Sequence, residues 1–143
     1  MVTTVRADLV AGVTTMMTAF IAANPTLLRR HFRSRPPSLN SDTPFSYLDL
    51  HPESVHHANG LRDRIITPQV VIVDRLTDNL ETEDRFDVLV DSLMDHFTTY
   101  PHITTGSIWS DMTVADETIQ DGDSFFAAVR FTFSDFQKTE GRT

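Results

Sequence analysis

The stretch HPESVHHANGLRDRIITPQVVIVD, residues 51–74, decides the fold because it joins a polar segment to a strongly apolar one. Residues 61–76 predict a long strand, and its VVIV segment has the composition of a strand buried on both faces. Pro68 interrupts the pattern and cannot donate a backbone hydrogen bond. We therefore expect the first half of this strand, with Arg62 and Arg64, to form a sheet edge or to bend away from the sheet.

The beginning of the same stretch is rich in histidine. Pro52 and the pair Asn59-Gly60 favour a turn or a wide loop over residues 51–60. Imidazole and carboxylate groups suit zinc or another divalent ion, so a metal site is one interpretation. Its ligands would come from His51, Glu53, His56 and His57. Their spacing matches no known ligand motif, so we favour a solvated loop that holds no metal.

Two segments have the periodicity of amphipathic helices. The first helix ends at Asn24, because Pro25 disfavours helix in the residue before it, and the second ends at Tyr100-Pro101. The apolar face of the first is formed by Val2, Val5, Leu9, Val13, Met16 and Phe20. The apolar face of the second is formed by Phe86, Leu89, Leu93, Phe97 and Tyr100. We expect Leu93 and Phe97, in the middle of that face, to lie in the core.

The remaining segments predict strands. Residues 26–33 favour a short strand and residues 45–50 a second one. Residues 108–119 and 124–136 flank an Asp-Gly turn signal, which predicts a C-terminal β-hairpin. The chain is therefore expected to be a single α+β domain, residues 1–143. It should have a mainly antiparallel sheet of about four to five strands, with both helices packed on one face.

Composition excludes several classes of function. The 143 residues contain no cysteine, which removes disulfides, thiolate metal sites and a cysteine nucleophile. A net charge of -8 disfavours tight binding to the DNA backbone or to anionic lipid. No phosphate-binding or nucleophile motif is present. The second helix carries Asp84, Asp87, Asp91 and Asp95 opposite its apolar face. A solvated helix face explains them better than paired catalytic carboxylates.

Basic residues concentrate in two places in this acidic chain. Arg62 and Arg64 form one pair. The other group is formed by Arg29, Arg30, Arg33 and Arg35, with no acidic residue among them. Phosphate contact is possible for such a segment. Because the chain is acidic and only Phe32 interrupts the arginines, a salt-bridging surface for a protein partner fits better. All six arginines are therefore candidate interface residues.

The order of the segments resembles a known family. An N-terminal helix leads through a Pro-containing loop to a strand, and a GLRDR element then opens a strand that ends in TPQVVIVD. An acidic amphipathic helix and an aromatic C-terminal hairpin follow. This arrangement resembles the tail terminator proteins of long-tailed bacteriophages, with GLRDR to TPQVVIVD, residues 60–74, as the strongest part of the likeness. The histidine cluster and RSRPPSLNSDTP, residues 33–44, match no feature of the family.

The resemblance implies a structural virion protein of the phage tail and neck, assembled in the host cytoplasm. Such a protein forms a homo-oligomeric ring, a hexamer, that caps the tail tube, stops its polymerisation and joins it to the head–tail connector or stopper protein. It has no cofactor, no enzymatic activity and no membrane contact. DNA passes through its lumen without sequence-specific binding. An acidic lumen would let DNA slide.

Three alternatives remain open at this stage. One is another phage neck protein, such as a head–tail connector subunit. Another, from a different class, is a small metal-dependent hydrolase that uses the histidine cluster of residues 51–57. A third is a small binding module. A ring-sized particle in solution would favour the tail terminator or the connector subunit.

Overall fold

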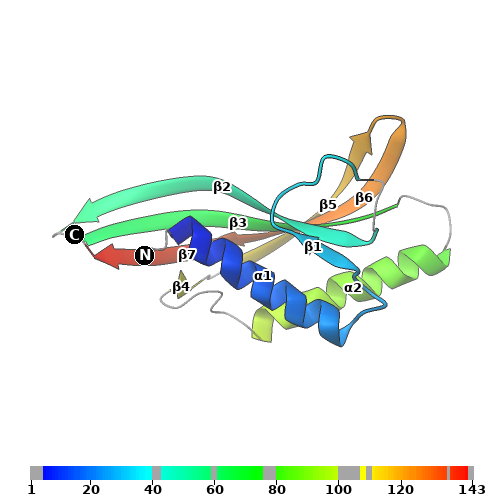
Figure 1. Cartoon of the computed structure of the whole chain (residues 1–143), viewed down its shortest axis with the longest axis horizontal. Coiled ribbons are helices and arrows are strands. Elements are labelled where there is room, and N and C mark those ends of the chain that lie inside the picture. Colours follow the sequence, from blue (N-terminus) through cyan, green and yellow to red (C-terminus); the bar gives the residue numbers. More distant parts are fainter. Residues whose placement is uncertain are drawn as a thin grey trace.

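The computed structural model describes the backbone of residues 5–39, 43–58, 61–75, 80–99, 107–108, 111–134 and 136–141, and within these the side chains of 7–39, 43–50, 67–75, 83–99 and 111–133. Figure 1 shows two helices against one long, twisted sheet. The elements in chain order are α1 (Val5–Ala23), β1 (Arg30–Phe32), β2 (Phe45–Ala58), β3 (Leu61–Arg75), α2 (Leu80–Thr99), β4 (Ser107–Ile108), β5 (Asp111–Asp121), β6 (Ser124–Ser134) and β7 (Phe136–Gly141).

The sheet is mostly antiparallel. Its main path runs β1-β2-β3-β6-β5, and only the short β1 pairs in parallel, with β2. β7 continues beyond β6 along the same side of β3, and β4 pairs with β7. In Figure 1, β2, β3 and β7 run on past the helices as an arm, while the β5–β6 hairpin projects from the opposite end of the sheet. The expected α+β class and the C-terminal hairpin are confirmed.

Both helices pack on one face of the sheet, as expected. Leu9, Val13, Met16 and Phe20 of α1 are buried, and so are the mid-helix residues Leu89, Leu93 and Phe97 of α2. They meet sheet residues whose side chains share one face: Leu48, Val70, Ile72, Val129, Phe131 and Phe133. The Phe97 ring packs edge-to-face on Phe131 and Phe133, with ring centroids 5.2 and 5.0 Å away. The two sequence periodicities therefore build the main core.

A histidine joins the two helices. His96 of α2 places its Nε2 atom 3.0 Å from the main-chain oxygen of Met16 in α1, and its ring packs edge-to-face on Phe20. Asn24 ends α1 as expected: its N–H donates to the main-chain oxygens of Phe20 and Ile21, and its side-chain amide donates to Phe20 as well.

A second core on the other sheet face was not predicted. It is formed by Leu39, Phe45, Tyr47, Val71, Val73, Phe126 and Ala128. Leu39 comes from the segment after β1, and its N–H donates to Asp121 Oδ2 at 2.9 Å, which fastens that segment to the tip of the β5–β6 hairpin. At the tip, Gly122 adopts φ 63°, a conformation that favours glycine. The central strands are thus covered on both sides, which explains their continuous apolar run.

Two expectations for residues 51–74 are wrong. Residues 51–58 are part of β2, not a loop, because Pro52 lies within a register shift between Leu50 and Glu53. Such a bulge tolerates a residue that cannot donate to the ladder. The first half of β3 is also not an edge, since it pairs with β2 on one side and with β7 on the other.

Pro68 has a different role from the one expected. On the side of β3 away from β2, pairing passes from β7 at Ile66 to β6 at Gln69. Pro68 lies at this change of partner, where the ladder on that side is interrupted. Each of the last two predicted strands is divided into two strands. Residues 108–119 correspond to β4 and β5, and residues 124–136 correspond to β6 and β7. Among the described residues, neither helix is long and apolar enough to cross a membrane.

Candidate functional site

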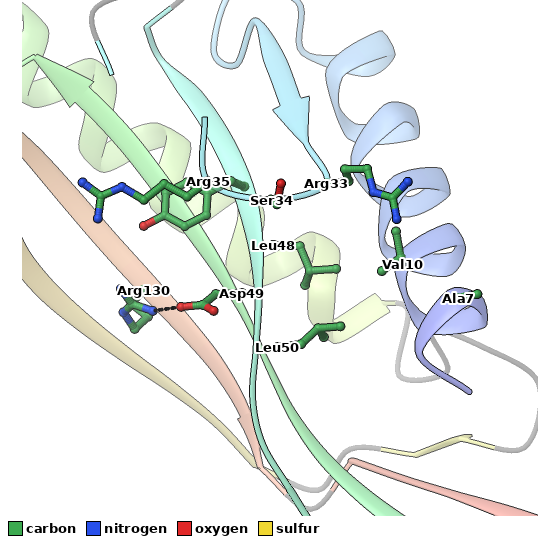
Figure 2. Close-up of a pocket in the computed structure, with 10 residues that line it drawn as sticks. Ala7, Val10, Arg33, Ser34, Arg35, Leu48, Asp49, Leu50 and Arg130 are labelled. Carbon is green, nitrogen blue, oxygen red and sulfur yellow. Dashed lines mark hydrogen bonds and ion pairs between the residues drawn. The ribbon is translucent and has the colours of Figure 1, made fainter. Parts of the chain in front are cut away.

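A groove of about 680 Å³ lies at the edge of the sheet where β1 ends. It is lined by Ala7, Val10, Arg33, Ser34, Arg35, Tyr47, Leu48, Asp49, Leu50 and Arg130. Figure 2 shows these residues around β2, with α1 on one side and β6 on the other. The groove is the place where the predicted arginine segment meets the sheet.

The groove exists because β1 is short. Only Arg30 to Phe32 pair with β2, opposite its first three residues, Phe45 to Tyr47. The chain leaves the sheet after Phe32, and Pro36 and Pro37, which cannot donate backbone hydrogen bonds, follow shortly afterwards. Within the part of the chain that the structure describes, no strand pairs with this side of β2 beyond Tyr47. The groove therefore opens onto an uncovered sheet edge.

Two exposed arginines flank this edge on opposite sides. In Figure 2 the Arg33 side chain lies next to Val10 of α1, on the side of β2 that carries Leu48 and Leu50. The Arg35 side chain extends to the other side of β2, the side of Arg130. An extended chain shows its side chains alternately to the two faces of a sheet. A strand laid along β2 would therefore meet one arginine on each face.

Arg130 forms the fixed floor of the groove. Its Nη2 and Nε atoms donate to Glu117 at 3.0 and 3.3 Å, and Nη1 donates to Asp49 at 3.1 Å and to Gln69 at 2.6 Å. The hydrogen bonds that Arg130 donates to Glu117 raise the pKa of Arg130 above its ordinary value. Because two carboxylates already neutralise it, Arg130 organises the sheet rather than offering charge to a ligand.

Tyr47 also lines the groove and is almost fully buried. Burial raises the pKa of its hydroxyl, while the positive charges of Arg130 and Arg35 act in the opposite direction. The phenol therefore stays neutral at physiological pH and can donate or accept a hydrogen bond. Tyr47, Asp49 and Arg130 were not singled out from the sequence. Asp49 and Arg130 are 81 residues apart, and only the register of the three strands β2, β3 and β6 brings them together.

Of the four predicted interface arginines whose side chains the structure describes, two come together. Arg33 and Arg35 line the groove, whereas Arg29 and Arg30 are exposed outside it. The Arg30 guanidinium lies 4.6 Å from the centre of the Phe32 ring, a cation–π contact within β1. Arg29 is held through its backbone, whose N–H donates to the main-chain oxygen of Pro44.

Arg62 and Arg64 lie in β3, in the interior of the arm. Arg62 is in register with His57 of β2 and Glu140 of β7, and Arg64 with Val55 and Lys138. The side chains of these two arginines are outside the described residues, so their assignment to an interface stays a prediction.

The histidine cluster lies on β2, in the arm. The side chains of His51, Glu53, His56 and His57 are outside the described residues, so the absence of a metal there also stays a prediction. Among the side chains that are described, no group of three or more histidines and acids is arranged to hold a metal ion. The acidic residues of α2 (Asp84, Asp87, Asp91 and Asp95) are all exposed, as a solvated face requires.

No protein-family model matches the sequence, and no curated protein matches it significantly.

Proposed function

We propose that this protein is a tail terminator of a long-tailed phage. Six copies form a ring that caps the tail tube, stops its polymerisation, docks the head–tail connector and leaves a channel for DNA. The likeness in segment order supports this proposal. The observation that carries it is the open edge of β2, flanked on both sheet faces by Arg33 and Arg35.

An open sheet edge fits an assembling subunit better than an isolated monomer. Unpaired strand edges promote unwanted association, and proteins usually shield them with a helix, a bulge or another chain. Here the edge extends through β2 into the arm that projects past the helices (Figure 1). A ring requires two different surfaces on each subunit that fit one another, and a strand edge with fixed charges beside it is one such surface.

The charge distribution fits a channel for DNA. The chain carries a net charge of -8, and the acidic side chains of α2 are exposed. A surface of this sign repels phosphates, so DNA would pass without being held.

The proposal is tested by mixing the purified protein with growing tubes of the tail tube protein from the same phage. Electron microscopy should show one ring at a tube end, and tubes should stop growing once capped. Rings that bind the head connector and never the tube would overturn the tail-terminator proposal in favour of a connector subunit. Tubes that grow at an unchanged rate and carry no ring would overturn it altogether.

A further inference from the structure

The sheet has two uncovered long edges in the part of the chain that the structure describes, one at each side. On one side, three of the fourteen residues of β2 pair with β1, which leaves the eleven residues from Leu48 to Ala58. On the other side, β5 has eleven residues and pairs only with β6. The two uncovered edges therefore match in length.

The two edges differ in charge. Arg33 and Arg35 flank the start of the uncovered part of β2. The β5 edge is acidic, with Asp111 and Asp116 exposed along the strand and Asp123 exposed in the turn that follows. Within β5, Glu117 is bound to Arg130 and Asp121 to the Leu39 N–H, so these two acids have roles inside the subunit. Complementary charge of this kind fixes the register between two surfaces.

The direction of the strands determines how two copies would meet. Successive neighbours from β2 through β3 and β6 to β5 are antiparallel, so β5 runs opposite to β2. Rotation about a ring axis to which the strands are tilted keeps neighbouring edge strands close to antiparallel and shifts them along one another. In such a ring, β5 of one subunit runs antiparallel to β2 of the next. The registers within one subunit place Leu48 level with Val114, so the neighbour's β5 must be shifted by about seven residues along the strands for its turn with Asp123 to reach Arg33 and Arg35. Strands tilted by about 45° to the ring axis, as in a β-barrel, produce such a shift.

We infer that the β5 edge of one subunit adds to the Leu48–Ala58 edge of β2 in the next, so that the sheet continues around the ring. Backbone hydrogen bonds join the edges, and Arg33 and Arg35 hold the acidic hairpin turn of the neighbour. The inference rests on the proposed ring. The occupant is a second copy because this chain itself supplies an edge of matching length and opposite charge. The two edges lie at opposite sides of the sheet, as a head-to-tail contact requires.

Cross-linking tests this contact directly, because the chain has no cysteine of its own. Ser34, Asp111 and Asp123 are exposed, so each can be replaced without disturbing the core. A chain with Ser34→Cys and Asp123→Cys should form a ladder of disulfide-linked oligomers under mild oxidation. Each single variant should give no product larger than a dimer. Ser34→Cys with Asp111→Cys is the matched control, since it places the second thiol at the far end of β5.

Three results would overturn the inference. Rings without the Ser34–Asp123 cross-link would overturn the strand contact and leave the ring standing. A cross-link only in the Ser34–Asp111 variant would overturn the shifted register on which the contact between Asp123 and the arginines depends. A chain that stays monomeric at all concentrations would overturn both the contact and the ring.

Charge reversal gives a second test that does not depend on thiols. Arg33→Glu with Arg35→Glu should raise the protein concentration needed for half assembly by about tenfold or more. Adding Asp123→Lys to this variant should lower that concentration part of the way back to the wild-type value. Arg29→Glu with Arg30→Glu makes the same charge change outside the groove and should alter this concentration by less than about threefold. Equal effects of the two double reversals would contradict the contact. Circular dichroism checks that each variant is folded.

Discussion

Arg130 of β6 holds Glu117 of the neighbouring strand through two hydrogen bonds, one from Nη2 at 3.0 Å and one from Nε at 3.3 Å. The same guanidinium reaches Asp49 of β2 at 3.1 Å. Arg130 therefore links β2, β5 and β6 through hydrogen bonds at the groove. Removing this arginine would leave two partly buried carboxylates without their cation.

We therefore predict that Arg130→Met lowers the free energy of unfolding by about 1–3 kcal/mol at pH 7. Urea denaturation at pH 7 measures it. Arg29→Met is the control, since Arg29 is exposed and is held through its backbone N–H. It should change stability by less than about 0.5 kcal/mol. Equal losses for the two variants would contradict the assigned role of Arg130.

The main core allows a second prediction. Leu93 of α2 is fully buried, so Leu93→Ala should lower the free energy of unfolding by about 2–5 kcal/mol through lost burial and a cavity. Val88, on the outer side of the same helix, is 52% exposed. Val88→Ala should cost less than about 0.5 kcal/mol. A Leu93→Ala protein as stable as the Val88→Ala protein would show that α2 does not pack on the sheet in solution.

A third prediction concerns acid sensitivity. His31 lies against Ser46, with 2.7 Å between Nδ1 and Oγ, and burial lowers its pKa from 6.5 to about 4. The unfolded chain therefore binds a proton near pH 6.5, whereas the folded chain does so only near pH 4. The stability linked to His31 is full above pH 6.5. It falls as the pH drops toward 4, by about 3 kcal/mol at most.

This linkage is measured by denaturation of the wild type and of His31→Gln between pH 7 and pH 4. The variant should lose less stability over this range, because glutamine does not titrate. Parallel curves for the two proteins would mean that His31 titrates alike in the folded and unfolded chains.

A fourth prediction concerns the arginines of the arm. Arg62→Glu with Arg64→Glu should leave the subunit folded by circular dichroism but weaken the ring or its capping of tubes. Arg29→Glu with Arg30→Glu is the control, because both arginines are exposed and lie outside the arm. If the arm variant still forms rings and still yields tails of normal length, Arg62 and Arg64 do not belong to an interface.

Much of the fold could be predicted because the helices have one apolar face each. Helical spacing predicts that one face of each helix is buried, and the structure confirms it. The buried residues are Leu9, Val13 and Phe20 in α1, and Leu89, Leu93 and Phe97 in α2. The length of β2 could not be predicted, since Pro52 is a turn signal in sequence and is accommodated here by a local bulge. Local patterns do not show which bulge a neighbouring strand will tolerate.

The site was predictable only in part. A run of arginines without acids singled out Arg33 and Arg35, but nothing in the run separates them from Arg29 and Arg30. That difference arises because β1 ends at Phe32, so the residues after it leave the sheet and border the groove. The second core could not be predicted for a similar reason. Leu39 lies in a segment rich in turn residues, and its burial depends on Asp121, 82 residues away.

Native mass spectrometry of the purified wild-type chain tests the central claim most directly. A ring-forming subunit should give one dominant species of six copies, and this species should persist over a wide range of protein concentrations because a closed ring has no open ends to extend. A monomer at every concentration, or a continuous series of oligomers with no preferred size, would contradict the account.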